Sequence, residues 1–236
     1  ASHGLNICIL HRDGRSAMQN IEAEFAALKQ EGVSILTLNQ DALKAEVRQS
    51  ALGDLKEAMG VGGRIRMLLH SVAKGNLKPM LSEDGNELRR DDLLLTLDAM
   101  AVGLYDWTKA VHQAGLFATD ARVLSFTSEG SSRAWRNYAA VSAAKAALED
   151  ITRNIALEFA REGIKANCIQ AGVTDTASFR AIPGAEILRS HSLKRNPNKR
   201  LTTPEDVAAV VYLLAKDEAA WINGAIIPVD GGEHIN

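Results

Sequence analysis

The stretch "LNICILHRDGRSAMQNIEAEFAALKQEGVSILTL", residues 5 to 38, decides the fold class. Five of its first six residues are apolar, which is typical of a buried strand. Apolar residues at steps of three and four then predict a helix with one apolar face, namely Met18, Ile21, Phe25 and Leu28. A second apolar run at residues 33 to 38 predicts another strand. A strand, a helix and a strand in this order indicate a parallel pair.

The same alternation continues along the chain. Further apolar runs predict strands at residues 65–70, 122–126, 165–170 and 225–229. Helices are expected near residues 43–59, 91–114 and 136–161, and another begins with Thr203 as N-cap and Pro204 at its first position. We therefore expect an α/β fold: a Rossmann-type, doubly wound parallel sheet with helices on both faces, in a single domain over residues 1–236.

Composition excludes several classes of protein. The 236 residues are 46% hydrophobic and 24% charged, as in an ordinary globular domain. A net charge of −2 provides no field for binding nucleic acid. No apolar stretch approaches the ~20 residues of a membrane span, so we expect a cytoplasmic protein. Cys8 and Cys168 lie in apolar runs and are expected to be buried thiols, and we predict no metal site.

The stretch "NYAAVSAAK", residues 137–145, contains a candidate catalytic pair. Tyr138 and Lys145 are seven positions apart, which places them on one helix face about 10 Å apart along the axis. A nearby ammonium favours the phenolate, so Lys145 is expected to lower the pKa of Tyr138 and make it a better proton donor or acceptor near neutral pH. Taken alone, such a pair is more often structural than catalytic.

Longer stretches give the pair a context. "VLSFTSEGSS" (123–132), "SAAKAALEDITRNIALEFAREGIKANCIQAG" (142–172) and "RLTTPEDVAAVVYLLAKDEAAWINGAIIPVDGG" (200–232) resemble the short-chain dehydrogenase/reductase family. The resemblance extends from the first strand to Gly232. It implies a Rossmann sheet that binds NAD(H) or NADP(H).

Two departures from the common family pattern point to one branch. Most members place the tyrosine four residues before the lysine, where this chain has Val141, and Tyr138 stands one turn earlier. This spacing resembles the branch that reduces enoyl thioesters on acyl carrier protein. "LLHSVA" (68–73) agrees, because it is similar to the His-Ser-aliphatic sequence of enoyl reductases and not to the Asn-Asn-Ala-Gly of most members.

The shifted tyrosine has a physical reason. In enoyl reduction, hydride adds to the β-carbon while negative charge develops on the thioester oxygen, several bonds away. Moving the phenol by one turn, about 5 Å, would place its hydroxyl beside that oxygen in the manner of an oxyanion hole.

The resemblance also implies roles for individual residues. Lys145 is expected to hold the nicotinamide ribose, and Ser128 either orients the substrate or caps a strand-end turn. The remaining cofactor contacts are assigned to Asp41 at the adenine amine with Ala42 beside it, to Ser71 and Val72, and to the loop of Gly172, Val173 and Thr176 at the nicotinamide carboxamide.

Two features of the first strand concern the cofactor. His11 and Arg12 stand where NAD-specific members place an acid, and Arg12 can pair with a 2′-phosphate, so we expect NADPH, with NADH possible. The Gly-rich turn that seats the pyrophosphate is absent from the sequence. Residues 1–4 resemble the end of a helix, so we expect a natural protein longer by one β-α unit, about two dozen residues, whose strand is central in the sheet.

Residues 177–200 have weak periodicity and are expected to form a mobile lid, or alternatively a solvated surface loop. Their cations could steer an acidic acyl carrier protein, or could simply keep the loop soluble: Arg180, Arg189, Lys194, Arg195, Lys199 and Arg200. A homo-oligomer through the helix at 91–114 and the catalytic helix is implied by the resemblance.

The sequence thus predicts NADPH-dependent reduction of an enoyl thioester, with Tyr138 stabilising and protonating the enolate. One alternative is a ketone or alcohol oxidoreductase that uses the same cleft. The other is a non-catalytic family member that has lost dinucleotide binding.

Overall fold

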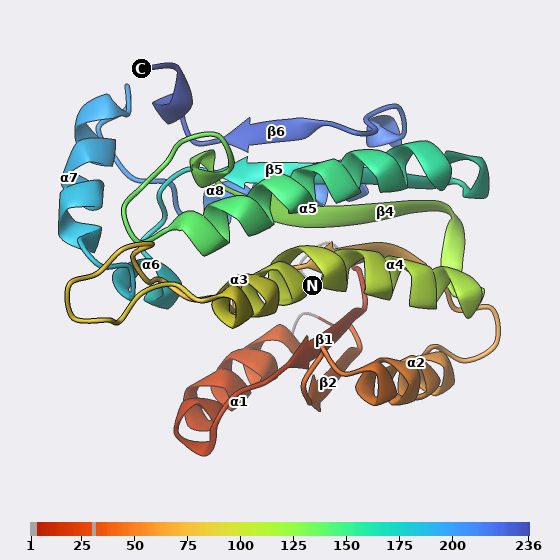
Figure 1. Ribbon diagram of the computed structural model, residues 1–236. Helices are drawn as coiled ribbons and strands as arrows, with labels where there is room; N and C mark the ends of the chain where they lie inside the picture. Colours follow the sequence, from red (N-terminus) through yellow and green to blue (C-terminus); the bar gives the residue numbers. More distant parts are fainter. Residues whose placement is uncertain (1–3, 30–31) are drawn as a thin grey trace. The chain divides into compact units, whose positions relative to one another are not determined.

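The computed structural model describes residues 4–29 and 32–236 and falls into two compact units (Figure 1). The first contains the residues up to Arg64 together with Ala110–Leu116, and the second contains Ile65–Lys109 and Phe117–Asn236. Residues 1–3, interpreted above as part of a helix end, lie outside the described residues.

The first unit is a strand-helix-strand arrangement followed by a helix. Strands β1 (Ile7–His11) and β2 (Ile35–Asn39) pair in parallel, as the opening stretch predicts. Helix α1 (Arg15–Lys29) connects them, and α2 (Ala45–Met59) follows. The prediction that Cys8 is buried is wrong, since it is exposed. It lies in a strand whose described neighbour is β2 alone.

The second unit contains a four-stranded sheet. Its order is β3-β4-β5-β6, and all neighbours are parallel. The strands are β3 (Ile65–His70), β4 (Phe117–Thr127), β5 (Ile164–Ala171) and β6 (Ile226–Val229). All four carboxyl ends therefore lie at the same edge, where α/β proteins place their ligands.

Helices complete this unit. α3 (Arg90–Leu97) continues through a π-helical turn, η1 (Asp98–Val102), into α4 (Gly103–Gln113). The others are α5 (Ala139–Glu158), α6 (Ala177–Arg180), α7 (Ala185–Arg195) and α8 (Pro204–Ala215). Short 3-10 turns are η2 (Glu129–Ser131), η3 (Ala160–Glu162), η4 (Asp217–Ala219) and η5 (Glu233–Ile235). Thr203 caps α8 as predicted, because its hydroxyl accepts the Asp206 N–H.

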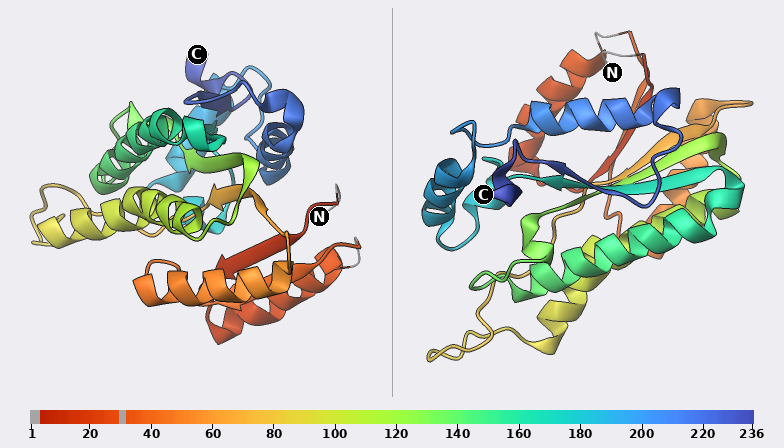
Figure 2. Two further views of the ribbon diagram at one scale, coloured as in Figure 1. Left: turned by 90° about the vertical axis from the view of Figure 1, so that its right-hand side faces the viewer. Right: turned by 90° about the horizontal axis from the view of Figure 1, so that it is seen from above.

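Both faces of this sheet are covered, which confirms the doubly wound prediction. Neighbouring strand residues point to opposite faces: Val123 and Cys168 pack in one cluster with Leu148 of α5. Leu124 and Ile169 pack in another with Leu214 of α8. The view from above shows α5 and α8 on opposite sides of the sheet (Figure 2).

The described strands form two separate sheets, one of two strands and one of four. Within the described residues, β1 pairs only with β2, and β3 pairs only with β4.

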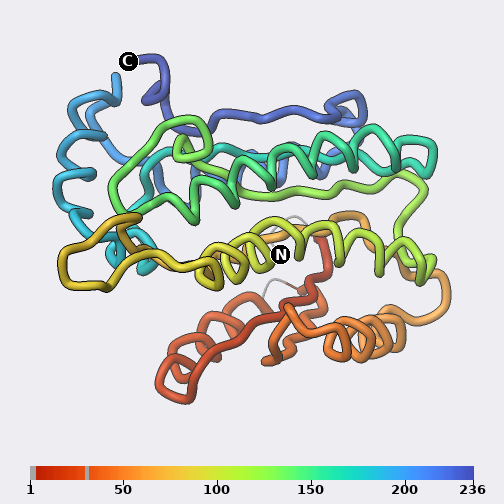
Figure 3. The backbone as a smooth tube through the Cα atoms, viewed as in Figure 1, coloured from red at the N-terminus to blue at the C-terminus, as the bar shows by residue number. Residues whose placement is uncertain are grey.

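Two connections carry residues of the predicted site. Residues 71–89 form a long loop between β3 and α3 (Figure 3). The predicted lid at 177–200 is not an irregular loop, because it contains α6 and α7. Four of its side chains are buried: Phe179, Ser192, Arg195 and Asn196. The structure describes no helix long and apolar enough to cross a membrane.

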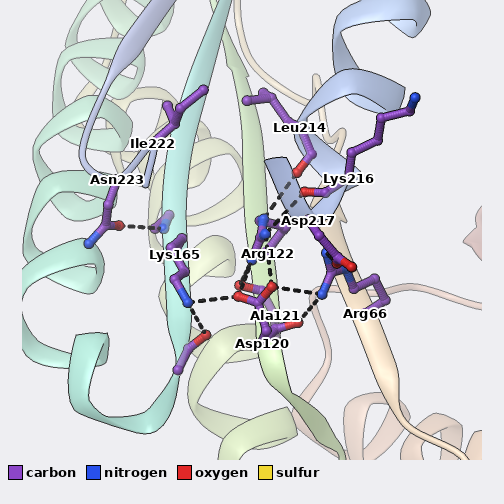
Figure 4. A network of polar contacts seen from close by, with 12 residues as sticks. Arg66, Asp120, Ala121, Arg122, Lys165, Leu214, Lys216, Asp217, Ile222 and Asn223 are labelled. Atoms are coloured by element: carbon purple, nitrogen blue, oxygen red, sulfur yellow. Dashed lines mark hydrogen bonds and ion pairs between the residues drawn. The ribbon is translucent and has the colours of Figure 1, made fainter. Parts of the chain in front are cut away.

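A network of charges stabilises the amino-terminal end of the four-stranded sheet (Figure 4). Asp120 accepts hydrogen bonds from Arg66, Arg122 and Lys165, which belong to three neighbouring strands. Arg122 is fully buried and also donates to the Leu214 carbonyl near the end of α8. The guanidinium thereby gives a terminal helix carbonyl a hydrogen-bond donor. Its positive charge also interacts favourably with the negative end of the helix dipole.

Candidate active site

The predicted active-site residues of the second unit gather at the carboxyl edge of its sheet. Ser71 and Val72 directly follow β3, Ser128 directly follows β4, and Gly172 directly follows β5. Helix α5, which carries Lys145, packs on β4 and β5. Residues far apart in the sequence therefore meet where a parallel sheet offers a binding edge.

Tyr138 stands just outside the helix in which the sequence analysis places it. It is the N-cap residue of α5, and Asn137 before it has a φ of 63°, in the left-handed region that asparagine tolerates. The tyrosine ring is half-buried and packs against a cluster that includes Met100 and Val141. The direction of its side chain is therefore set by a turn and not by the helical period.

The predicted effect of Lys145 on this tyrosine is wrong. Burial raises the pKa of Tyr138, and Ser128 is close enough to oppose that rise. Lys145 is not among the groups that shift this pKa, and its Nζ donates to the Phe126 carbonyl at 2.6 Å. In this structure Tyr138 is thus a protonated hydrogen-bond donor at neutral pH.

Ser128 and Gly130 form a wall beside the phenol. A Cβ placed on Gly130 would lie 2.7 Å from a ring carbon of Tyr138 and 3.2 Å from Ser128 Oγ, so only glycine fits without displacement. Ser128 Oγ is buried and completes no hydrogen bond of normal geometry with a described residue. Such a hydroxyl is suited to a ligand, which favours substrate orientation over turn capping, since its side chain makes no cap bond.

Lys145 lies in the second turn of α5. Burial lowers its pKa, and the charge of Glu149 opposes that change. Thr127 fixes Glu149 through a 2.6 Å hydrogen bond to its carboxylate. Because an ammonium has three donors, Lys145 can hold the Phe126 carbonyl and still donate to the hydroxyls of a ligand.

His70 is the histidine of the "LLHSVA" stretch, but the sequence analysis assigns it no role at the site. It ends β3, is 6% exposed, and its Nε2 has no hydrogen-bond partner among the described residues. Burial lowers its pKa to about 4, helped by the charge of Lys145, while the carbonyls of Ala99 and Met100 in the π-helical turn oppose this. Two signals pointed to it: its place in the His-Ser-aliphatic stretch and its position at the carboxyl end of β3.

The loop after β5 contains Gly172, Val173 and Thr176, to which the resemblance assigns the nicotinamide carboxamide. Gly172 is required there, because a Cβ would lie 2.4 Å from Thr202 Oγ1. The Val173 N–H donates to Glu233 at 3.4 Å, a long contact that a ligand can replace. Thr176 Oγ1 caps α6 by accepting the Phe179 N–H, which leaves its own O–H able to donate.

These groups fit a pyridine nucleotide. The Ser128 hydroxyl and the His70 imidazole each present a buried, unpartnered polar atom within the described structure, and Lys145 has further donors. A ribose and a carboxamide require hydrogen-bonding groups of this kind. Within the second unit, Lys145, Val173 and Thr176 are the residues that would hold them.

The predicted adenosine residues belong to the first unit. Arg12 Nη1 contacts Asp41 Oδ2 at 2.8 Å, so the predicted phosphate and adenine ligands pair with each other. His11 Nδ1 contacts Asp13 Oδ2 at 2.7 Å, and Ala42 is half-buried beside Asp41. Because Arg12 is 58% exposed, its ion pair is weak and a ligand can compete for it.

The basic residues of segment 177–200 are mostly neutralised, which the sequence analysis does not anticipate. Arg180 and Arg189 pair with Asp175, Arg195 with Glu129, and Arg200 with Asp206. The Lys199 ammonium donates to the Lys194 carbonyl and not to an acid. Lys194 and Lys199 are therefore the main cations on which an electrostatic role of this segment depends.

Two cavities open beside this segment, of about 480 and 530 Å³. The first is lined by residues that include Asp175, Arg189 and Lys199, and the second by Asn196, Asp230 and His234. Neither contains Tyr138, Lys145 or Ser128. The candidate site is therefore the set of strand ends, where the unpartnered His70 Nε2 and Ser128 Oγ lie.

A doubly wound parallel sheet with tyrosine, lysine and serine at its carboxyl edge defines the short-chain dehydrogenase/reductase class, whose members are NAD(P)H-dependent oxidoreductases. The family model described as "Enoyl-(Acyl carrier protein) reductase" matches residues 1–234. The chain belongs to this enoyl reductase-like family of oxidoreductases.

Individual proteins show the same similarity. The NADH-dependent enoyl-[acyl-carrier-protein] reductase FabI of Enterococcus faecalis is 32% identical over 188 residues, which are 79% of this chain and 72% of that protein. The crystal structure of the Bacillus cereus enoyl-acyl carrier protein reductase with NADP+ and indole naphthyridinone is 26% identical, with a TM-score of 0.85, over 99% of this chain and 86% of that one. The 3-oxoacyl-[acyl-carrier-protein] reductase MabA of Mycobacterium tuberculosis is 41% identical over 96 residues, 41% of this chain and 38% of that protein.

Proposed function

We propose that this protein reduces the carbon-carbon double bond of enoyl thioesters, with NADPH as the hydride source. The observation that carries the proposal is the place of the tyrosine. Val141, which occupies the position of the usual family tyrosine, is 5% exposed and packed against Met100 and Ala144. Tyr138 is instead half-buried, with its ring against Gly130, two residues after Ser128.

The chain's own residues then have distinct tasks. When bound, the nicotinamide cofactor supplies the hydride. Tyr138 donates a hydrogen bond to the thioester oxygen and then its proton to the enolate, and its raised pKa keeps it protonated until then. Ser128 orients the thioester, and Lys145 binds the ribose hydroxyls.

Comparing two substrates tests the reaction. We expect crotonyl thioester to be reduced with a kcat/KM at least about tenfold above that for acetoacetyl thioester, because the phenol is aimed at an oxygen remote from the reduced carbon. The measurement is NADPH oxidation followed by absorbance. A preference for the keto substrate would support the alternative, ketone reduction, which the partial similarity to MabA favours.

If neither substrate is reduced, the remaining hypothesis is a non-catalytic family member. NADPH-induced thermal stabilisation separates the two cases. A shift shows dinucleotide binding, while no shift at saturating NADPH supports loss of that binding.

The choice of cofactor is proposed from Arg12. Arg12→Ala should raise the KM for NADPH about tenfold and leave the KM for NADH unchanged, because a charge-assisted contact to the 2′-phosphate is lost. NADH in the same assay is the control. Equal changes in both KM values would contradict a role in phosphate recognition.

We also propose an acyl carrier protein as the natural substrate carrier and a homo-oligomer as the assembly. Lys194 and Lys199 support the first, and a charge reversal at both should raise KM for a carrier-bound substrate more than for a small thioester. The exposed apolar residues of α3, η1 and α4 support the second: Leu94, Leu95, Val102 and Tyr105. Light scattering that gives a monomer mass would contradict it.

A further inference from the structure

Arg195, at the end of α7, is a buried cation that donates four hydrogen bonds. It is 9% exposed, and its Nη1 and Nη2 donate to the two carboxylate oxygens of Glu129 at 2.8 and 2.7 Å. Its Nε and Nη2 also donate to the backbone carbonyls of Asn236 and Glu233 at 2.7 and 2.8 Å. Arg195 therefore connects α7 and the η5 region to the turn that follows β4.

Glu129 is the first residue of that turn, η2, and directly follows Ser128. Its carboxylate also contacts Arg133 Nε at 3.2 Å. The bidentate pair with Arg195 is the stronger contact, because both hydrogen bonds are short and the Arg195 side chain is only 10% exposed. The charged pair thus fixes η2 against a helix 66 residues further along the chain.

The next residue in the turn, Gly130, is the one in contact with the tyrosine ring. Tyr138 and Ser128 occupy the space that a side chain at Gly130 would need, because a Cβ there would lie 2.7 Å from the ring and 3.2 Å from Ser128 Oγ. A displacement of η2 would therefore move Ser128 and the Gly130 wall together. The Tyr138 ring would lose the surface against which it rests.

We infer that the Glu129–Arg195 ion pair is a positioning device that holds the η2 turn so that Ser128 and Gly130 fix the Tyr138 phenol for catalysis. This inference rests on the proposed function of Tyr138. Neither Glu129 nor Arg195 reaches the reacting atoms through any contact described here, so both are positioning residues. The pair also gives segment 177–200 a role at the site through its fold, separate from any role in docking a carrier.

Four variants of the full chain test this inference: Arg195→Gln, Arg195→Lys, Glu129→Gln and Gly130→Ala. We expect kcat with crotonyl thioester to fall about 10- to 100-fold, because a misplacement of about 1 Å has effects of this size. KM for NADPH should stay within about threefold. Arg195→Lys, which keeps the charge, should retain more activity than Arg195→Gln. The control is Arg153→Gln, which breaks the exposed ion pair between Arg153 and Asp150 on α5.

A second readout is independent of the substrate. In the wild type, a nuclear Overhauser effect should connect the Tyr138 ring protons with the Gly130 α-protons, and it should weaken in Glu129→Gln and Arg195→Gln but not in Arg153→Gln. Glu129→Gln decides if Arg195→Gln fails to fold, because it keeps the Arg195 bonds to the backbone carbonyls. An unchanged Overhauser effect, or a kcat equal to that of the control, would overturn the inference. If wild-type protein reduces no enoyl thioester, the proposed function fails while the Overhauser effect still decides the positioning.

Discussion

The pKa of the buried His70 side chain is set by its surroundings at the site. Its imidazole is neutral at pH 7, because burial and the nearby Lys145 ammonium both disfavour the charged form. Its pKa is lowered to about 4, from about 6.5 in an unfolded chain. Between these two values the unfolded chain binds the proton and the folded protein does not.

The sign of the pH dependence follows directly. Stability rises with pH across this window and is lost as the pH falls from about 6.5 to about 4, by up to about 3 kcal/mol. We expect His70→Gln to flatten the curve of unfolding free energy against pH there, relative to wild type. Urea denaturation at half-unit steps measures it. Parallel curves for the two proteins would show that His70 does not carry this dependence.

At the scale of elements, Asp120 joins strands β3, β4 and β5 to each other and, through Arg66 and Arg122, to the carbonyls at the end of α8. The hydrogen bonds from Arg122 and Lys165 hold the pKa of Asp120 well below its usual range. Arg122 is fully buried, so the Asp120 carboxylate is needed to stabilise its positive charge.

Asp120→Asn should therefore lower the free energy of unfolding by about 2 to 3 kcal/mol, a value reduced from that of a dry buried pair because Asp120 is 32% exposed. The midpoint of urea denaturation measures the change. Asp150→Asn breaks the exposed Asp150–Arg153 pair and should change stability by less than about 0.5 kcal/mol. Similar losses in the two variants would contradict a special role for the network.

At the scale of the whole molecule, local sequence patterns predict the order of elements well. Apolar runs locate the strands, and Thr203 with Pro204 marks the start of α8 to the residue. The strand ends also predict which residues of the second unit share an edge, since a parallel sheet brings them together by topology alone. Ser71, Ser128 and Gly172 are in this group.

Features that depend on the folded environment were not predictable in the same way. The helical period places Tyr138 in α5, but the left-handed Asn137 delays the start of the helix to Ala139, so Tyr138 is its N-cap residue. The charges of segment 177–200 find partners outside it, such as Glu129, that no local pattern reveals. Helix α7 has little separation of polar and apolar faces, because it buries the polar Ser192 and Arg195.

The most direct test of the account is the activity of Tyr138→Phe. The central claim is that this phenol stabilises and protonates the enolate, so removing one oxygen should lower kcat for crotonyl thioester at least about 100-fold. KM for NADPH should stay within about threefold, and the circular dichroism spectrum should be unchanged. A Tyr138→Phe protein that folds and keeps more than about a tenth of wild-type kcat would contradict the claim.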